Sequence, residues 1–249
     1  MPCLVAKQLL ERHHYLHSYP GGTKLAFGAF LVPRLMGALT LGVGPINAHL
    51  LVDGATPDDC LTLTRLWLSD ELPRNSESRF IGMVLRSLRK YTDLKFLVAY
   101  ADPARGHVGI IYQATNWFYT GLCQATPLYD IGDGRVHHSR SLGYSFGSHG
   151  LAHLRQQGIQ VRLVPQQGKH RYIYFIQSSW RSRVRAPILP YPQALNHMNH
   201  QRKNSVNKVN LFHRVSASNH TPVEQPKTIQ SPLGPEDTVV AFFTERTAS

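Results

Sequence analysis

The stretch over 100–121 carries more polar and aromatic side chains than ordinary packing requires. An apolar run over 96–100 is typical of a short buried strand, and the turn signal Asp102-Pro103 ends it. The sequence then predicts a short helix start over 106–119, which holds one histidine, two tyrosines, an asparagine and a tryptophan. Because ligands of open α/β sheets bind beyond the carboxyl ends of strands, this segment indicates a site.

Two residues of this stretch have the chemistry of catalytic groups. Asp102 can serve as a general base or a metal ligand, and Tyr112 as a proton donor or a hydrogen-bonding group. Each has a structural alternative, since Asp102 can cap the following turn and Tyr112 can pack under the helix. We expect Trp117 and Tyr119 to lie in the core rather than to form a stacking platform for a flipped base.

A second group of candidates lies near the N-terminus, where His13 to Ser18 includes three imidazoles within five residues. His14 and Tyr15 fall at a predicted helix end, where ring nitrogens can bind a metal or move protons. The alternative is a histidine cluster on a solvent-facing helix end. No histidine or cysteine spacing in the sequence has the strength of a zinc motif.

A third candidate is the loop Asn75–Arg79, which precedes an amphipathic helix. Backbone N–H groups at a helix N-terminus, together with Arg74 and Arg79, can hold a phosphate or pyrophosphate. An ordinary capped helix is the alternative. The position of the loop between a long strand and this helix, in the middle of a mixed sheet, favours the anion site.

Several other chemistries are excluded. No Gly-x-Ser-x-Gly stands at a strand–helix turn, which argues against a serine hydrolase. Acidic residues are scarce outside 53–77, so the paired carboxylates of a glycosidase are absent. The glycine-rich stretch 143–150 matches no phosphate fingerprint. Cys3, Cys60 and Cys123 are far apart, which suits a reducing compartment.

The elements that must position these groups are read from the hydrophobic pattern. We expect a helix over 4–17, a hairpin of strands 25–32 and 35–43, and a strand over 61–68. Asn75 or Ser76 can cap the next helix, whose apolar positions share one face. These positions are Phe80, Ile81, Val84, Leu85 and Leu88.

The second half of the chain is less regular. Strands are expected over 126–142 and 159–176, around a helical 149–157. From about residue 180 the character changes, and 196–235 has the composition of a disordered segment. We therefore expect a catalytic domain at 1–180 and a basic, largely disordered tail at 181–249. A short apolar patch over 238–243 could dock, at a place that the sequence does not indicate.

Charge points to a polyanionic partner. The net charge is +12, and residues 1–180 hold 18 Lys and Arg against 11 Asp and Glu, a surplus of seven. The folded part is therefore itself basic, which favours nucleic acid ahead of an anionic membrane surface. No run of about 18 apolar residues is present, so we expect an intracellular, cytoplasmic protein that does not span a membrane.

Three blocks of residues carry a family resemblance. They are His14-Tyr15 with Ser18 and Pro20; Arg65-Leu66-Trp67-Leu68 through Asn75-Ser76-Glu77-Ser78-Arg79-Phe80-Ile81; and Tyr100-Ala101-Asp102-Pro103 with Gly106-His107, Gly109, Tyr112 and Asn116-Trp117. Over roughly residues 4–178 the chain resembles the Mom family of phage DNA-modification proteins. The third block is long and ordered enough to be fairly specific.

The resemblance implies a fold and an activity. The fold would be α/β, with a mixed, mostly antiparallel sheet flanked by helices, related to the GCN5-type N-acetyltransferases. The activity would be conversion of adenine N6 in double-stranded DNA to the methylcarbamoyl form, which shields phage DNA from host restriction enzymes. A neutral adenine amine is a poor nucleophile, so such a site needs a base, an activated donor and a way to expose N6.

The resemblance also implies roles for residues. On the matching positions the functional residues would be His14, Tyr15, Asp102 and Tyr112, and a bound iron would have His14, Tyr15 and Asp102 as ligands. The cofactor-binding segment would be the counterpart of the acyl-CoA pyrophosphate loop, formed by Asn75, Ser76, Glu77, Ser78 and Arg79. This loop lacks the glycines of acetyltransferases, so the donor is either acyl-CoA-like or another activated compound.

Two other functions remain open at this stage, and the oligomeric state is open as well. One alternative is a conventional acetyl-CoA-dependent N-acetyltransferase that acts on a small amine or a protein. The other is a basic DNA-binding protein that has kept an enzyme fold without its chemistry. The dense set of reactive residues at predicted strand ends argues against the second.

Overall fold

The computed structural model describes residues 1–148, 150–193 and 239–245 of the chain. The helices are α1 (Cys3–His13), α2 (Ser76–Tyr91), α3 (Ile110–Gln113), α4 (Ser139–Phe146) and α5 (Leu151–Gln156). The strands are β1 (Thr23–Leu31), β2 (Arg34–Gly42), β3 (Cys60–Leu68), β4 (Phe96–Ala101), β5 (Phe118–Leu122), β6 (Leu128–Asp130), β7 (Val136–His137), β8 (Arg162–Val164), β9 (His170–Phe175) and β10 (Val239–Glu245).

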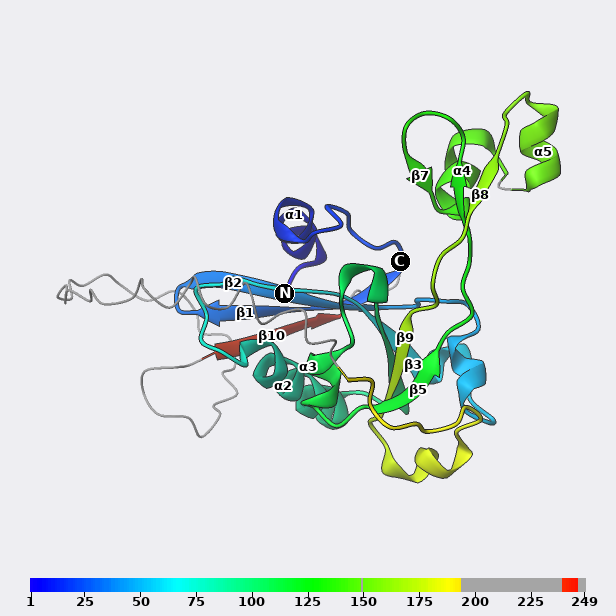
Figure 1. Cartoon of the computed structure of the whole chain (residues 1–249). Helices are drawn as coiled ribbons and strands as arrows, with labels where there is room; N and C mark the ends of the chain where they lie inside the picture. The colour runs from blue at the N-terminus through cyan, green and yellow to red at the C-terminus, as the bar shows by residue number, and fades with distance from the viewer. Residues whose placement is uncertain (149, 194–238, 246–249) are drawn as a thin grey trace.

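One large sheet organises the molecule. Seven strands pair in the order β10-β1-β2-β3-β4-β9-β5, and β3–β4 is the one parallel pair among those described (Figure 1). This confirms the prediction of a mixed α/β fold with a mostly antiparallel sheet flanked by helices. The predicted hairpin is β1 and β2, the predicted strand over 61–68 is β3, and the first predicted helix is α1.

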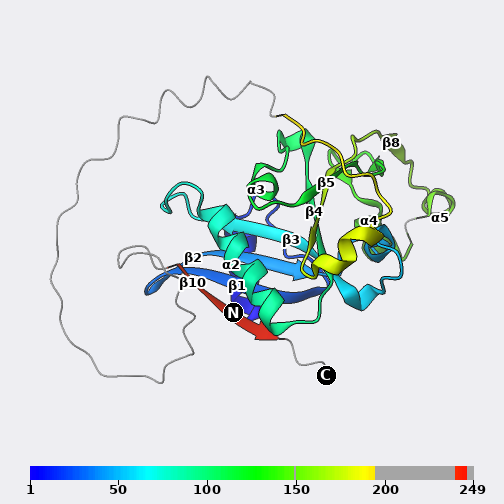
Figure 2. The same ribbon diagram turned by 90° about the horizontal axis from the view of Figure 1, so that it is seen from below.

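The sheet buries its two faces against different helices. Helix α2 covers one face, where its predicted apolar positions join the main core with Phe27 and Leu39 of the hairpin (Figure 2). Helix α1 lies on the opposite face, where Ala6 and Leu10 pack against Ala26 and Ala38. The small side chains of the sheet at that contact let α1 approach closely, which fixes the position of the residues that follow it.

Helix α2 begins at Ser76, as its sequence predicts, but Asn75 does not cap it with its side chain. Asn75 has a φ of 66°, in the left-handed region that asparagine tolerates better than most residues. Its backbone carbonyl accepts the N–H of Arg79, which is 3.0 Å away. The loop therefore enters the helix through a tight turn of the backbone.

Strands β3 and β4 stay paired over a short distance. β3 pairs with β4 over Cys60–Leu63, whereas its ladder with β2 continues to Leu68. Beyond Leu63 the side of β3 that faces β4 has no ladder partner among the described strands. Arg65 and Trp67 lie in this part of β3, next to the end of α1.

Three strand ends meet in one row beside the candidate site. The last residue of β4, Ala101, pairs with His170 at the start of β9, and His170 pairs with Leu122 at the end of β5. The helix start predicted over 106–119 is shorter than expected, since α3 covers four residues and 118–122 form β5. The β5 ladder with β9 overrides a helical reading of these aromatic residues.

The chain between β5 and β9 forms a projecting arm, defined here as residues 123–169. It contains β6, β7 and β8, which form a sheet of their own, together with α4 and α5 (Figure 1). The strands predicted over 126–142 and 159–176 are therefore wrong in their extent, since α4 replaces the end of the first and the second splits into β8 and β9. The predicted helix over 149–157 is present as α5.

The ordered chain extends past residue 180. Val184 forms a bridge with Val52, Leu189 forms one with Tyr119, and the Tyr191 hydroxyl donates a hydrogen bond to the Trp117 carbonyl, 2.9 Å away. The apolar patch predicted over 238–243 lies largely in β10, which pairs with β1. The segment 196–235, expected to be disordered, lies outside the described residues. None of the described helices has the length and apolarity needed to cross a membrane.

The turn that leads from Asp102 to α3 depends on Gly109, which yields a prediction. Gly109 has a φ of 78°, and a Cβ there would lie 2.5 Å from the ring of Tyr172. We expect Gly109→Ala to lower the free energy of unfolding by about 3 kcal/mol, because it adds a steric clash to the strain of a positive φ. Urea denaturation measures the loss.

Gly106→Ala is the matched control. Gly106 has a similar φ of 71°, but a Cβ there would meet nothing within 4 Å. We expect this variant to lose about 1 kcal/mol, which is the cost of the backbone conformation alone. Equal losses for the two variants would contradict the proposed packing of Tyr172 against Gly109.

Candidate functional site

The end of α1 and the loop after β4 bring together residues that are about 90 positions apart in the sequence. The rings of His14 and Tyr15 stack with their centroids 4.4 Å apart, and the His107 ring meets Tyr15 edge-on at 5.9 Å. The Arg105 guanidinium lies 5.6 Å from the centre of the Tyr15 ring. Since Asp102 belongs to the same loop as Arg105 and His107, two predicted groups of candidates form one cluster.

His14 is held as a neutral hydrogen-bond donor. Its side chain is 5% exposed, and its Nδ1 accepts the backbone N–H of Leu16, 3.1 Å away. Burial lowers the pKa of His14 to about 4, and the positive charge of Arg65 and the neighbouring His17 and His107 contribute to the shift. With Nδ1 occupied as an acceptor, the neutral ring carries its hydrogen on Nε2.

Tyr15 gives the cluster its accessible face. The residue is 47% exposed, although His14 stacks on its ring and the Arg105 guanidinium lies over it. Burial and the negative charge of Asp102 raise the pKa of the Tyr15 hydroxyl, although Arg65 and Arg105 partly oppose the shift. Tyr15 therefore remains a neutral phenol at physiological pH.

Asp102 combines the structural and the functional alternatives. Its Oδ1 accepts the backbone N–H of Ala104 at 3.0 Å, which caps the short 3₁₀ turn Pro103–Arg105. Its Oδ2 lies 3.4 Å from Nζ of Lys169, at the root of the arm. The carboxylate is thus kept next to a cation, and its position at the strand end is fixed by the turn that it caps.

Tyr112 lies beneath the cluster in the main core. It is buried, and its ring packs against Trp117 at 5.2 Å and Tyr172 at 5.3 Å between centroids. Burial, followed by the neighbouring Tyr15 and Tyr172 hydroxyls, raises the pKa of Tyr112. Trp117 and Tyr119 are buried in the same core, which confirms the prediction that they fill the core rather than form a platform.

Three residues of the site were missed from the sequence. Arg65 reaches the cluster from β3, held by Ser18 through two hydrogen bonds and by the carbonyl of Thr64 at 2.7 Å. His107 contacts Tyr15, and Lys169 contacts Asp102. His107 stands in the third motif block and could have been found there, but Lys169 carries no signal because its role depends on the strand register.

The predicted anion loop lies at the start of α2 and bonds within itself. The Ser76 hydroxyl donates to the Pro73 carbonyl at 2.6 Å, and the Ser78 hydroxyl donates to the Asn75 carbonyl at 3.0 Å. Arg74 and Arg79 are exposed. Over the described residues, no hydrogen bond, ion pair or ring contact joins Asn75–Arg79 to the His14 cluster.

The residues as they stand do not fit the metal that the resemblance implies. A neutral imidazole binds a metal through its unprotonated nitrogen, and in His14 that nitrogen is engaged with Leu16. Among the residues that the structure describes, no three His, Cys, Asp or Glu side chains are grouped to hold a metal ion. Iron therefore stays a prediction, and no chemical step is derived through it.

Fold and site together define a mixed α/β protein with an aromatic, titratable cluster at the carboxyl end of a central strand. Residues 1–193 match the model of the Mom protein family, and the chain belongs to that family. It is 28% identical over 203 residues to the methylcarbamoylase mom of Escherichia phage Mu, and the alignment covers 77% of this chain and 81% of the relative. The match extends past residue 180 and includes the arm.

The neutral state of His14 predicts a pH dependence of stability. The unfolded chain binds a proton at His14 below about pH 6.5, whereas the folded chain does so below about pH 4. His14 therefore makes the fold lose about 2 kcal/mol between pH 7 and pH 5, because protons favour the unfolded state over this interval. Urea denaturation at the two pH values measures the loss.

His14→Gln is the comparison, because glutamine keeps a donor and an acceptor and does not titrate. We expect the free energy of unfolding of this variant to fall by about 2 kcal/mol less than that of the wild type over the same interval. The other histidines contribute equally to both proteins. Parallel pH dependences would show that His14 titrates normally in the folded chain.

Proposed function

We propose that this protein modifies DNA in the cytoplasm of a phage-infected cell, converting the N6 amine of adenine to its methylcarbamoyl form and protecting the DNA from host restriction. The observation that carries the proposal is the match of residues 1–193 to the Mom family, together with the name of the phage Mu relative, a methylcarbamoylase. The basic body of the chain supports double-stranded DNA as the substrate, since phosphate neutralisation supplies most non-specific affinity.

The cluster contains groups suited to this reaction. Acylation of adenine forms a bond between N6 and the donor carbonyl carbon, breaks the bond to the leaving group and releases one proton from N6. Asp102 is the base that accepts this proton. His14 donates its Nε2 hydrogen to the carbonyl oxygen of the donor, where negative charge develops.

The two tyrosines have different parts in the proposal. N6 is hydrogen-bonded within the duplex, so the adenine must leave the stack to react. The half-exposed Tyr15 contacts the extruded base through the part of its side chain that His14 and Arg105 leave open. Tyr112, buried and neutral below it, orients the base or the donor through its hydroxyl.

The donor is held by the loop at the start of α2. Its first-turn N–H groups and the exposed guanidinium groups of Arg74 and Arg79 can bind the anionic part of an activated donor. Strands β3 and β4 are not paired beyond Leu63. This unpaired stretch lies between the loop that follows β3 and the site that follows β4, which supports the assignment. Relation to the GCN5-type acetyltransferases remains part of the proposal.

The proposal predicts a new nucleoside in DNA. Plasmid DNA from cells that express the chain should contain an adenosine heavier by one methylcarbamoyl unit, detected by nucleoside mass spectrometry. Asp102→Ala removes the proposed base and should lower the amount of this nucleoside by at least 100-fold, the contribution expected of a general base. Circular dichroism checks that the variant is folded.

Asp58→Ala is the control, since Asp58 is an exposed carboxylate near the other end of β3. It should modify DNA like the wild type. Full activity of Asp102→Ala would overturn the site assignment. Unmodified DNA from the folded wild type, together with turnover of acetyl-CoA on a free amine, would replace the proposal with a conventional N-acetyltransferase.

A further inference from the structure

We propose that the arm, residues 123–169, is a DNA-backbone contact that holds the duplex beside the candidate site. This inference rests on the proposed function for its choice of partner. Nothing in the family match or in the name of the relative assigns a role to the arm. The argument comes from its point of attachment, its charge and its exposed arginines.

The strand register fixes the arm to the edge that carries the site. The chain enters the arm after Leu122, the last residue of β5, and returns to the sheet at His170, the first residue of β9. These two residues pair in the same row as Ala101. At the root, the N–H of Cys123 donates to the Lys169 carbonyl at 2.8 Å. Lys169 also contacts Asp102 directly. A duplex that presents a base to this edge therefore lies next to the arm.

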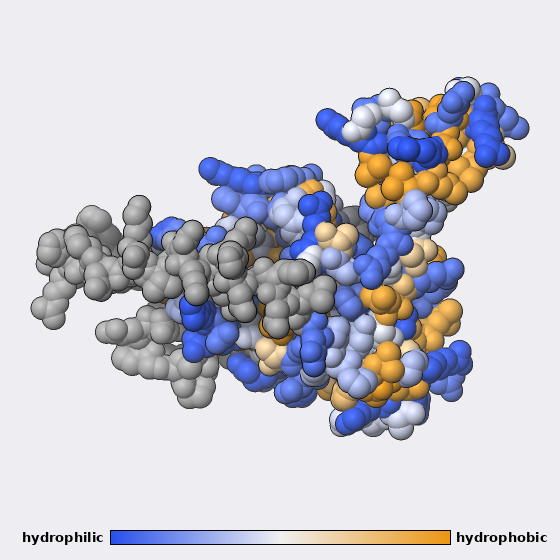
Figure 3. Space-filling model, in the orientation of Figure 1, coloured by the Kyte–Doolittle hydropathy of each residue, from blue (hydrophilic) through white to orange (hydrophobic). Residues whose placement is uncertain are grey.

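The insertion is much longer than the connection needs. Antiparallel neighbours such as β5 and β9 can be joined by a turn of two to five residues, but 47 residues separate Leu122 from His170. The arm buries side chains of its own, with Leu142 2% and Leu154 0% exposed. It stands away from the body, with a hollow between it and the α1 side (Figure 3). A long, separately packed insertion next to a site is typical of a binding element.

The charge of the arm suits phosphate. By sequence it has five Lys and Arg against two Asp, and both aspartates have a side-chain partner within the arm. Asp130 binds Arg162 at 2.6 Å, and Asp133 binds His137 at 2.8 Å. The arm therefore keeps a surplus of positive charge, and each of its two carboxylates is engaged by a neighbouring side chain.

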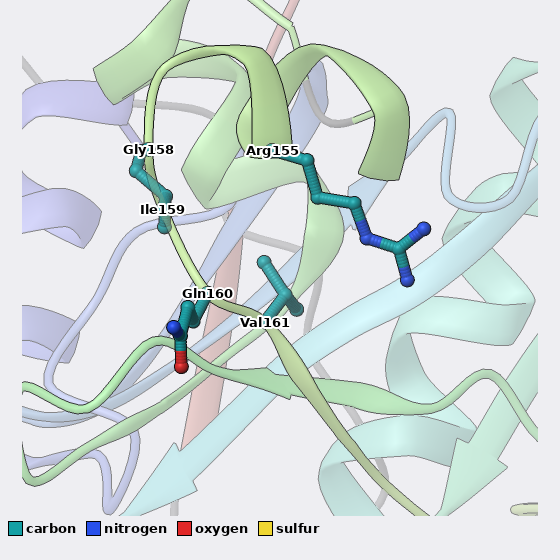
Figure 4. Close-up of a pocket in the computed structure, with 5 residues that line it drawn as sticks. All are labelled: Arg155, Gly158, Ile159, Gln160 and Val161. Carbon is teal, nitrogen blue, oxygen red and sulfur yellow. The ribbon is translucent and has the colours of Figure 1, made fainter.

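Two arginines of the arm are exposed and lack side-chain partners within the described part of the chain. Arg135 follows the turn that contains Gly132 and Gly134, both at positive φ. Arg155 lies at the end of α5, beside a hollow that is also lined by Gly158–Val161, and its guanidinium extends away from that segment (Figure 4). Exposed guanidinium groups without carboxylate partners are suited to binding DNA phosphates.

The test is the double variant Arg135→Glu with Arg155→Glu in the full chain. Its affinity for a fluorescein-labelled duplex of about 20 base pairs is measured by anisotropy at several KCl concentrations. We expect the variant to bind at least about tenfold more weakly, and the slope of log K against log salt to fall by about 2, since two phosphate contacts are lost. Unchanged circular dichroism shows that it is folded.

Arg86→Glu with Lys90→Glu is the matched control. These residues are exposed on α2, across the sheet from α1, and the substitution changes the net charge by the same amount. The control should bind like the wild type, with an unchanged salt slope. Equal weakening of both variants would overturn the proposal in favour of a non-specific charge effect. An arm variant that binds like the wild type would overturn it in favour of a protein-docking role.

The chemistry is measured separately on the same proteins by nucleoside mass spectrometry. If the wild type binds DNA through the arm but leaves adenine unmodified, the proposed reaction fails and the arm assignment stands. If the wild type modifies adenine and the arm variant keeps its affinity, the reaction stands and the arm assignment fails. A folded wild type that does not bind the duplex overturns the arm assignment.

Discussion

The alignment of three strand ends is the constraint on which the rest of the structure depends. Ala101, His170 and Leu122 lie in one row because β9 pairs antiparallel with β4 on one side and, across an irregularity between Tyr119 and Leu122, with β5 on the other. A shift of one residue would turn every side chain of a strand to the other face, so the buried aromatic residues of β9 fix this register strongly. Asp102, Lys169 and both ends of the arm then follow at the same edge. The site and the insertion beside it share one geometric origin.

The N-terminal half of the site depends on a different contact. Helix α1 packs through Ala6 and Leu10 onto the small residues of the hairpin. This packing fixes where His14, the residue after α1, lies relative to the sheet. The chain turns at His14 through the Leu16 N–H bond, and that bond determines which ring nitrogen carries the hydrogen. A local turn therefore selects the tautomer, and burial keeps the ring neutral.

Sequence patterns predicted the elements with long, unbroken periodicity. The hairpin, β3, α2 and its buried face were all found, because each alone presents a complete apolar stripe. Of the arm, α5 was found but the short strands were not, since they have two or three residues and gain their conformation from pairing with one another. Within the site, the candidate residues at the end of α1 and in the loop after β4 were predicted from their types. The Lys169–Asp102 ion pair was not, because it joins positions 67 apart through the strand register. The catalytic roles themselves stay predictions.

The distribution of charge connects the site with its proposed substrate. Inside the cluster, His14, Tyr15 and Tyr112 are neutral, since burial raises or lowers each pKa away from the charged form. Around it lie the basic residues Arg65, Arg105 and Lys169, and the exposed arginines of the arm extend the positive potential outward. Neutral rings beside the Asp102 carboxylate suit an uncharged reacting group, and the surrounding cations favour a polyanionic carrier. An adenine base attached to a DNA duplex combines these two properties, whereas a free small amine would be cationic at neutral pH and would meet repulsion at this rim.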